Sequence, residues 1–240
     1  VQTCALPIFL KIWYTRFNQL NESEDIKMDI LETMKARHSV RQYKNQAIES
    51  SKREKINALI KDVNAESKLS IQVFYDEPKC FDSFMAHYGK FENVKNYIAI
   101  VGNKNDQEKA GYYGEKIVLK CQKLGLNTCW VAMTHGKSKA QIKRGQKLLI
   151  IISLGYGETQ GVPHKSKSIA ELGQADQKNE WFEKGMEAVS LAPTAVNQQK
   201  FYFELKNGIV TAKNLGGFYS RIDLGIVKYH FEVVTGHEVK

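Results

Sequence analysis

Four short polar side chains follow a proline in the segment 191-LAPTAVNQQKFYF-203: Thr194, Asn197, Gln198 and Gln199. Pro193 ends the preceding helix, because it lacks a backbone N–H and pushes the residue before it out of the helical region. The three carboxamides carry both donors and acceptors, so they could hydrogen-bond the edge of a flat heteroaromatic ligand. The aromatic run 201-FYF-203 is typical of a buried strand that would hold this loop in place. The alternative is an ordinary polar connector without chemistry.

A second candidate site lies near the other end of the chain, in 37-RHSVR-41. It follows a short amphipathic segment, whose helix is expected to end close to Arg37. Side chains alternate along an extended chain, which would place Arg37, Ser39 and Arg41 on one side. Two guanidinium groups around a hydroxyl can hold a phosphate monoester dianion. The alternative is a solvated basic turn.

The elements that must position these segments follow from the apolar spacing. Helical periodicity predicts helices at about 29–36, 52–63, 109–124, 179–191 and 217–235. Apolar and aromatic runs predict strands at about 71–76, 97–102, 147–154, 201–206 and 209–213. The Asn207-Gly208 pair predicts a tight hairpin between the last two strands. This mixture indicates an α+β fold with helices covering mixed or antiparallel sheets. No G-x-G-x-x-G sequence is present, which argues against a Rossmann domain.

Taken together, the two segments resemble the motifs of the nitroreductase family of flavin-dependent oxidoreductases. In that family an R-x-S-x-R element binds the phosphate and ribityl chain of FMN, and an A-P-[ST]-A-x-N-x-Q element lines the flavin ring. The first pattern matches at Arg37, Ser39 and Arg41. The second pattern matches at Ala192, Pro193, Thr194, Ala195, Asn197 and Gln199, with Gln198 as an additional amide. The stretches 124-LGLNTCWV-131 and 154-LGYGETQGVPHKSKS-168 are also similar to the family, and the resemblance spans about residues 28–240.

The resemblance implies a nitroreductase-like fold and an FMN-dependent oxidoreductase. NADH or NADPH would supply electrons, and a nitroaromatic, quinone or similar small molecule would accept them. The phosphate end would be held by Arg37, Ser39 and Arg41, with His38 in the same region and Lys165 and Lys167 assisting. The ring would be faced by Pro193, Thr194, Ala195, Asn197 and Gln198 or Gln199. No side chain is assigned as a catalytic acid or base, because the flavin would perform the chemistry.

The position of the ring-binding motif departs from the usual family pattern. The motif comes in the second half of this chain, whereas 62-DVNAESKLSIQVFYDE-77, at the usual early position, lacks it. A subfamily of nitroreductases with two related half-units in one chain, which imitate the usual homodimer, is similar in this respect. We therefore expect an internal pseudo-dimer that stays monomeric, with one flavin between half-units at about 28–145 and 146–240.

Internal similarity supports this duplication. Residues 54–75 align without a gap with residues 183–204, and both segments end in a strand with aromatic residues. Residues 111–125 likewise resemble residues 217–231, because Gly, an aromatic residue and Tyr open an apolar helix in both. Helices share periodicity by chance, so the common order of the matches is the better support.

Composition is typical of a globular enzyme, with 42% apolar and 25% charged residues among 240. No apolar run is long enough to span a bilayer, and we expect no membrane partner. The net charge of +9 comes from dispersed lysines without a recognisable nucleic-acid motif, so no nucleic-acid partner is expected. Four cysteines without a C-x-x-C pair indicate a reducing, cytoplasmic setting. The scattered histidines predict no metal site.

Residues 1–27 differ from the rest, because they begin without Met, contain the apolar run 4-CALPIFLKIWY-14 and precede Met28. We expect them to be an extension outside the native domain; the alternative is an arm packed on that domain. Two other functions remain open for the chain. One is a flavin- or small-ligand-binding protein of the same fold without efficient turnover. The other is a basic interaction protein that has lost the cofactor.

Overall fold

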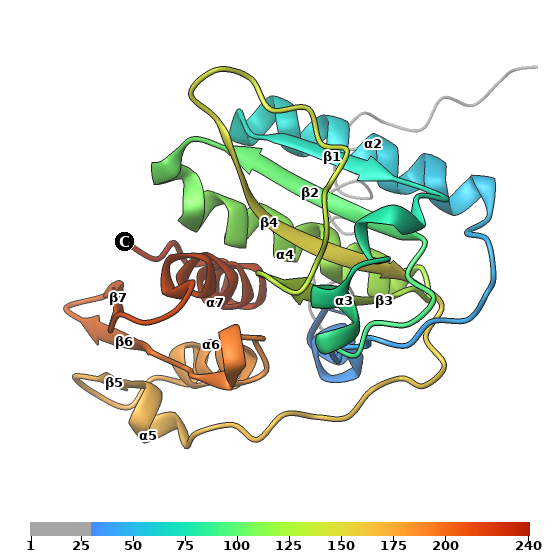
Figure 1. The fold of residues 1–240 in the computed structure, drawn as a ribbon. Helices are drawn as coiled ribbons and strands as arrows, with labels where there is room; N and C mark the ends of the chain where they lie inside the picture. The colour runs from blue at the N-terminus through green and yellow to red at the C-terminus, as the bar shows by residue number, and fades with distance from the viewer. Residues whose placement is uncertain (1–29) are drawn as a thin grey trace, which may run out of the picture.

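The computed structural model describes residues 30–240, so the expected extension at residues 1–27 lies outside the described part. After a short helix at 30–36, the first half of the chain builds an antiparallel sheet in the order β1-β2-β4-β3 (Figure 1). Its strands are β1 (Ser70–Phe74), β2 (Asn96–Gly102), β3 (Asn127–Val131) and β4 (Lys147–Gly155). The accompanying helices are α2 (Ser50–Ser67), α3 (Phe84–Tyr88) and α4 (Gln107–Lys123).

Both faces of this sheet are covered, which is why every residue of β2 is buried. Side chains alternate along a strand, so Ile98 and Ile100 pack with α2 and α4 on one face. Tyr97 and Ala99 point to the other face, where they meet Phe81 and residues of the segment after β1. A strand buried on both faces reads as a continuous apolar run, as 97-YIAIV-101 does.

The second half of the chain forms a smaller mixed sheet in the order β5-β6-β7. Its strands are β5 (Gly173–Ala175), β6 (Phe201–Lys206) and β7 (Ile209–Asn214). Its helices are α5 (Ile169–Leu172), α6 (Glu180–Ser190) and α7 (Ser220–Thr235). β5 pairs with β6 in parallel and β7 pairs with β6 antiparallel. Asn207 and Gly208 both have positive φ, 51° and 75°, as a two-residue hairpin turn requires.

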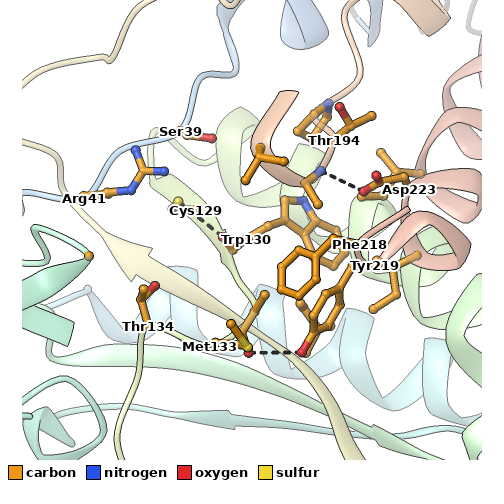
Figure 2. A pocket seen from close by; sticks show the side chains of 18 of the residues that line it. Ser39, Arg41, Cys129, Trp130, Met133, Thr134, Thr194, Phe218, Tyr219 and Asp223 are labelled. Atoms are coloured by element: carbon orange, nitrogen blue, oxygen red, sulfur yellow. Dashed lines mark hydrogen bonds between the residues drawn. The ribbon is translucent and has the colours of Figure 1, made fainter. Parts of the chain in front are cut away.

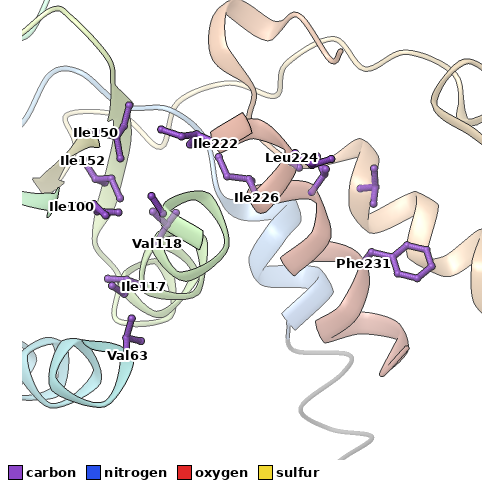
Figure 3. Close-up of a cluster of buried hydrophobic side chains, with 14 of the residues drawn as sticks. Val63, Ile100, Ile117, Val118, Ile150, Ile152, Ile222, Leu224, Ile226 and Phe231 are labelled. Atoms are coloured by element: carbon purple, nitrogen blue, oxygen red, sulfur yellow. The ribbon is translucent and has the colours of Figure 1, made fainter. Parts of the chain in front are cut away.

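Helix α7 connects the two halves, and it lies between the two sheets in Figure 1. Ile222 and Ile226 on this helix face Ile150 of β4 within the main hydrophobic core (Figure 3). Near the other end of the helix, Phe231 packs against Phe182 of α6 and Phe203 of β6. The two sheets therefore share the main core through α7, while the first sheet has a second, smaller core on its other face.

The predicted α+β fold with helix-covered sheets is confirmed, and each predicted strand is present within about two residues of its expected bounds. Among the described residues, the α-helices and strands without a prediction are β3, β5, α3 and α5. All four are five residues or shorter and lack a clear period. No helix within residues 30–240 has the length and apolar character needed to cross a membrane.

Apart from the short helix α3 between β1 and β2, the order helix, strand, antiparallel strand, helix occurs in both halves, as α2-β1-β2-α4 and as α6-β6-β7-α7. This order is what the duplication hypothesis expects. The boundary expected at 145/146 does not follow the sheets, because β4 pairs with β2 and β3 in the first sheet. A division by sheets falls after Gly155.

Candidate functional site

A pocket of about 260 Å³ brings the two sequence segments together, and we call it the arginine pocket. The first segment contributes Arg37, His38, Ser39 and Arg41. The second contributes Pro193, Thr194, Val196 and Asn197. The backbone N–H of Val40 donates to the Thr128 carbonyl, which fixes the 37–41 segment beside β3. Val40 is buried, and the alternation of the extended chain directs the arginines and Ser39 into the pocket.

Arg37 brings unused hydrogen-bonding capacity to this pocket. Its side chain is only 3% exposed, and its Nε and Nη1 atoms have no hydrogen-bond partner. Burial lowers the pKa of Arg37, and the negative charge of Glu115, 3.8 Å from Nε, opposes that effect. A buried donor without a partner costs roughly 1–3 kcal/mol. An anion in the pocket could relieve this cost, because phosphate oxygens accept from guanidinium N–H groups.

Two histidines near Arg37, His38 and His164, have pKa values below the ordinary value. Burial lowers the pKa of His38, and the Arg37 charge lowers it further. Burial and the Arg37 charge lower the pKa of His164 in the same way. Both rings therefore favour the neutral form near pH 7, and the Arg37 and Arg41 guanidinium groups supply the positive charge of this pocket. Such a field attracts anions.

A larger pocket of about 460 Å³ adjoins the arginine pocket, and we call it the aromatic pocket. The two share Ser39, Arg41, Pro193, Thr194 and Val196. Figure 2 shows Ser39 and Arg41 on one side of the aromatic pocket, with Trp130 in the centre and Phe218 and Tyr219 opposite. Its volume falls within the range of about 300–1,000 Å³ that is usual for small-molecule sites. A pocket lined by arginines next to a cleft lined by aromatic residues suits a ligand with an anionic group at one end and a flat ring at the other.

The loop that follows Pro193 has a strained backbone. Val196, Asn197 and Gln199 all have positive φ, at 47°, 53° and 46°. This conformation is uncommon for residues other than glycine and is a clear outlier for β-branched Val196. Val196 is 84% exposed and lines both pockets, so packing of its side chain does not explain the strain. Strain of this kind gathers at ligand sites, where the surrounding structure holds it.

The amide side chains of this loop hold its shape. Gln198 donates through Nε2 to the Phe218 carbonyl at 2.6 Å and to Asp223 at 2.7 Å. Gln199 is 4% exposed; its Oε1 accepts from the Lys167 backbone N–H, and its Nε2 donates to the Lys165 carbonyl. Neither glutamine lines either pocket, contrary to the expectation that one of them faces a ring. Asn197 lines the arginine pocket, although its Nδ2 also donates to the Lys165 carbonyl.

Lys165 and Lys167 do not line the pockets either. Their backbone is tied to the loop through Gln199, and Lys167 Nζ donates to the Gln199 carbonyl at 3.2 Å. That both lysines assist a phosphate stays a prediction. The 165–167 segment supports the strained loop from behind, and Gln199, the last residue of the motif, makes the hydrogen bonds between the two.

Asp223 was not predicted from the sequence, although it lines the aromatic pocket. Its Oδ1 accepts from the Ala195 backbone N–H at 2.9 Å, so it anchors the loop from the first turn of α7. Burial raises the pKa of Asp223 to about 6, against the opposing effect of the hydrogen bonds from Gln198 and Ala195. The signal available in the sequence was an aspartate among the apolar residues of 222-IDLGIV-227.

Glu115 is also absent from the sequence predictions, and it is fully buried on α4. It accepts from Trp130 Nε1 at 3.0 Å and from His230 Nε2 at 3.0 Å. Burial favours the neutral acid, but His230, Arg37 and the Trp130 N–H outweigh it and hold the pKa of Glu115 below its ordinary value. A lone Glu on the apolar side of a helix was the sequence signal for this group.

Comparison with known proteins places this arrangement among related folds. The family model described as "Putative TM nitroreductase" matches residues 29–235. A putative nitroreductase from Thermotoga maritima superposes with a TM-score of 0.61 at 23% identity, covering 85% of this chain and 82% of that one. No curated protein sequence matched the chain.

Shorter nitroreductase structures match part of the chain. A putative nitroreductase in complex with FMN from Desulfovibrio desulfuricans gives a TM-score of 0.47 at 15% identity, covering 59% of this chain and 93% of that one. An FMN-dependent nitroreductase from Clostridium difficile gives 0.43 at 22% identity, covering 58% and 92%.

Proposed function

The chain belongs to the nitroreductase family whose model it matches over residues 29–235, and from this membership we propose that it is an FMN-dependent oxidoreductase. The observation that carries the proposal is the buried Arg37 side chain. Arg37 lines a pocket that continues into an aromatic cleft, and its buried Nε and Nη1 have no hydrogen-bond partner. FMN has the matching chemistry, since it joins a phosphate dianion to a flat heteroaromatic ring.

The residues present fit this cofactor. Arg37 and Arg41 would hold the phosphate with Ser39 between them, because guanidinium groups bind phosphate oxygens in pairs. Pro193, Thr194 and Ala195 would lie along the ring in the aromatic pocket. When bound, FMN would supply two-electron transfer between a nicotinamide donor and an acceptor.

The protein itself would bind, orient and shield these reactants. The Trp130 and Tyr219 side chains form walls of the aromatic pocket, and Tyr219 is fixed by donating to the Ala132 carbonyl at 3.3 Å. Exposed Tyr88 and Met133 line the same pocket at 75% and 58% exposure, so the cleft is accessible from solvent. This accessibility supports turnover with an exchangeable substrate over storage of a sealed cofactor. NADH or NADPH would be the donor, and a nitroaromatic, quinone or similar molecule the acceptor.

Purification under native conditions tests the proposal. We expect a yellow protein with flavin absorbance and one FMN per chain, released on denaturation. Added NADH or NADPH should bleach that absorbance, and a quinone or nitroaromatic acceptor should restore it. A protein that takes up no flavin from excess FMN would contradict the proposal. A protein that binds FMN but is not reduced by either nucleotide would be a flavin-binding protein without this activity.

The duplicated architecture remains part of the same proposal. We infer that one chain builds the cleft that two subunits build in the usual homodimer, because both motifs meet within a single chain. Light scattering of the purified protein at several concentrations tests this: a monomer with one flavin is expected, and a dimer required for flavin binding would contradict it.

A further inference from the structure

The buried charges beneath the two pockets form a connected group. Glu115 on α4 contacts three side chains: Arg37, Trp130 and His230. Arg37 lines the arginine pocket, and Trp130 lines the aromatic pocket. His230 lies on α7 and also hydrogen-bonds through Nδ1 to the Ala188 carbonyl at 2.8 Å. One carboxylate thus touches a wall residue of each pocket and ties together elements from both halves of the chain.

One carboxylate serves this whole group. The two ring nitrogens of His230 lie at hydrogen-bond distance from Glu115 Oε1 and from the Ala188 carbonyl, at 3.0 Å and 2.8 Å. Glu115 is therefore a single buried carboxylate shared by His230, Trp130 and Arg37. Arg37 has only the electrostatic attraction of Glu115 at 3.8 Å, which leaves its Nε and Nη1 unused.

A buried ion pair can simply hold helices together, and His230 with Glu115 does connect α7 to α4. A role in joining α7 to α4 does not account for the contacts of Glu115 with Arg37 and Trp130. Removing the negative charge would leave the buried Arg37 guanidinium without a counter-ion, which costs several kcal/mol unless the side chain moves. Removing the indole partner would free Trp130 to rotate.

We propose that Glu115 is the positioning residue of this site, which fixes the Arg37 guanidinium at the arginine pocket and the Trp130 indole at the aromatic pocket. The inference rests on the proposed binding of FMN. Glu115 touches no ligand itself; it keeps the phosphate contact and the ring wall in fixed relative positions before the cofactor arrives. Such preorganisation increases affinity because fewer groups must be ordered on binding.

The substitution Glu115→Gln separates charge from hydrogen bonding. Its amide oxygen can still accept from Trp130, and its N–H can donate to a neutral His230 that keeps its bond to Ala188. The hydrogen bonds therefore remain while Arg37 loses its counter-ion. We expect the ratio of FMN to riboflavin affinity to fall about tenfold, with riboflavin affinity nearly unchanged, because only FMN carries the phosphate. Thermal stabilisation by inorganic phosphate should fall in parallel.

Three further variants test whether the effect of Glu115→Gln on the affinity ratio passes through Arg37. Trp130→Phe should weaken FMN and riboflavin binding by the same factor. In an Arg37→Ala background, Glu115→Gln should not change the affinity ratio again, because its effect passes through Arg37. Glu232→Gln is the matched control and should leave the ratio unchanged. Glu232 also links α7 to α4, by accepting from Tyr112 Oη at 2.7 Å, but it lines neither pocket.

Circular dichroism and thermal melting establish that each variant folds. If Glu115→Gln does not fold, Glu115→Asp keeps the charge and withdraws the carboxylate by one methylene, and the same fall in the ratio is expected. An unchanged or raised ratio in the variant that folds would overturn the positioning role. A parent protein that binds neither FMN nor riboflavin would instead overturn the proposed function, so the two failures are distinguishable.

Discussion

Gly111 of α4 and Gly225 of α7 lie against each other's helix in a reciprocal arrangement. A Cβ on Gly111 would lie 1.9 Å from the Ile222 carbonyl oxygen, and a Cβ on Gly225 would lie 1.9 Å from the Glu108 carbonyl oxygen. Each glycine meets the residue three positions before the other. A contact of this form is what a local two-fold axis produces, as at a symmetric dimer interface. The close crossing brings Glu115 to His230, and through them the two pockets to one carboxylate.

The crossing can be tested by adding one methyl group. Gly111→Ala should lower the free energy of unfolding by about 2 kcal/mol or more, because a clash with backbone cannot be relieved by a rotamer change. Helix propensity alone would act the other way, since Ala favours helices by roughly 1 kcal/mol over Gly. Urea unfolding measures the change, with Lys109→Ala at the exposed face of the same helix as control. A stabilised Gly111→Ala protein would contradict the close contact.

The arginine pair can be tested by charge removal. Arg37→Ala combined with Arg41→Ala should weaken FMN binding more than 100-fold, because each hydrogen bond to a charged group contributes about 1.5–3 kcal/mol. Flavin fluorescence titration gives the affinity, and circular dichroism checks the fold. The double variant Lys143→Ala and Arg144→Ala removes the same charge from an exposed loop and should bind FMN nearly as well as the parent. Stoichiometric flavin in the arginine variant would remove the basis for the phosphate assignment.

Gln199→Ala tests whether this glutamine holds the loop or faces the ligand. We expect a loss of about 1–3 kcal/mol in unfolding free energy, because the buried partners at Lys165 and Lys167 lose their hydrogen bonds. The visible spectrum of bound flavin should stay the same. Gln174→Ala, at an exposed position of β5, is the control and should change neither quantity. A shifted flavin spectrum with unchanged stability would place Gln199 at the ring after all.

The raised pKa of Asp223 gives a pH-dependent prediction. The folded state holds a proton on this carboxyl up to about pH 6, whereas its ordinary value is 3.8. Stability from this group is therefore full below pH 3.8 and is lost as pH rises through about 6. Asp223→Asn removes the titration, so the variant should gain about 2–3 kcal/mol relative to the parent between pH 4 and pH 7.

Urea unfolding at several pH values measures the Asp223 effect, and the difference between variant and parent cancels the other titrating groups. The same substitution at exposed Asp62, outside both pockets, is the matched control and is measured in parallel. If the difference in unfolding free energy between Asp223→Asn and the parent stayed constant from pH 4 to pH 7, the Asp223 carboxyl would not titrate as predicted.

The two candidate binding segments could be recognised in the sequence because each is a local pattern. A proline, short polar residues and an aromatic strand occupy consecutive positions, and so do the alternating residues of 37-RHSVR-41. Strand positions were predicted well for the same reason, since periodicity and the Asn207-Gly208 turn are properties of neighbouring residues. The short elements β5 and α5 give too few residues for a period to show.

What each side chain does was decided by tertiary structure. Local spacing could not show that Gln198 and Gln199 turn toward Asp223 and the 165–167 backbone, because those partners are far away in sequence. In the sequence Glu115 likewise looks like any other charged residue of a helix, because its partner His230 comes into contact with it only where α4 crosses α7. The sequence by itself determined the longer helices, five of the strands and the chemical types at both ends of the site. The tertiary structure decided which of them meet, because a buried charge finds its partners only when packing removes water and brings separate elements into contact.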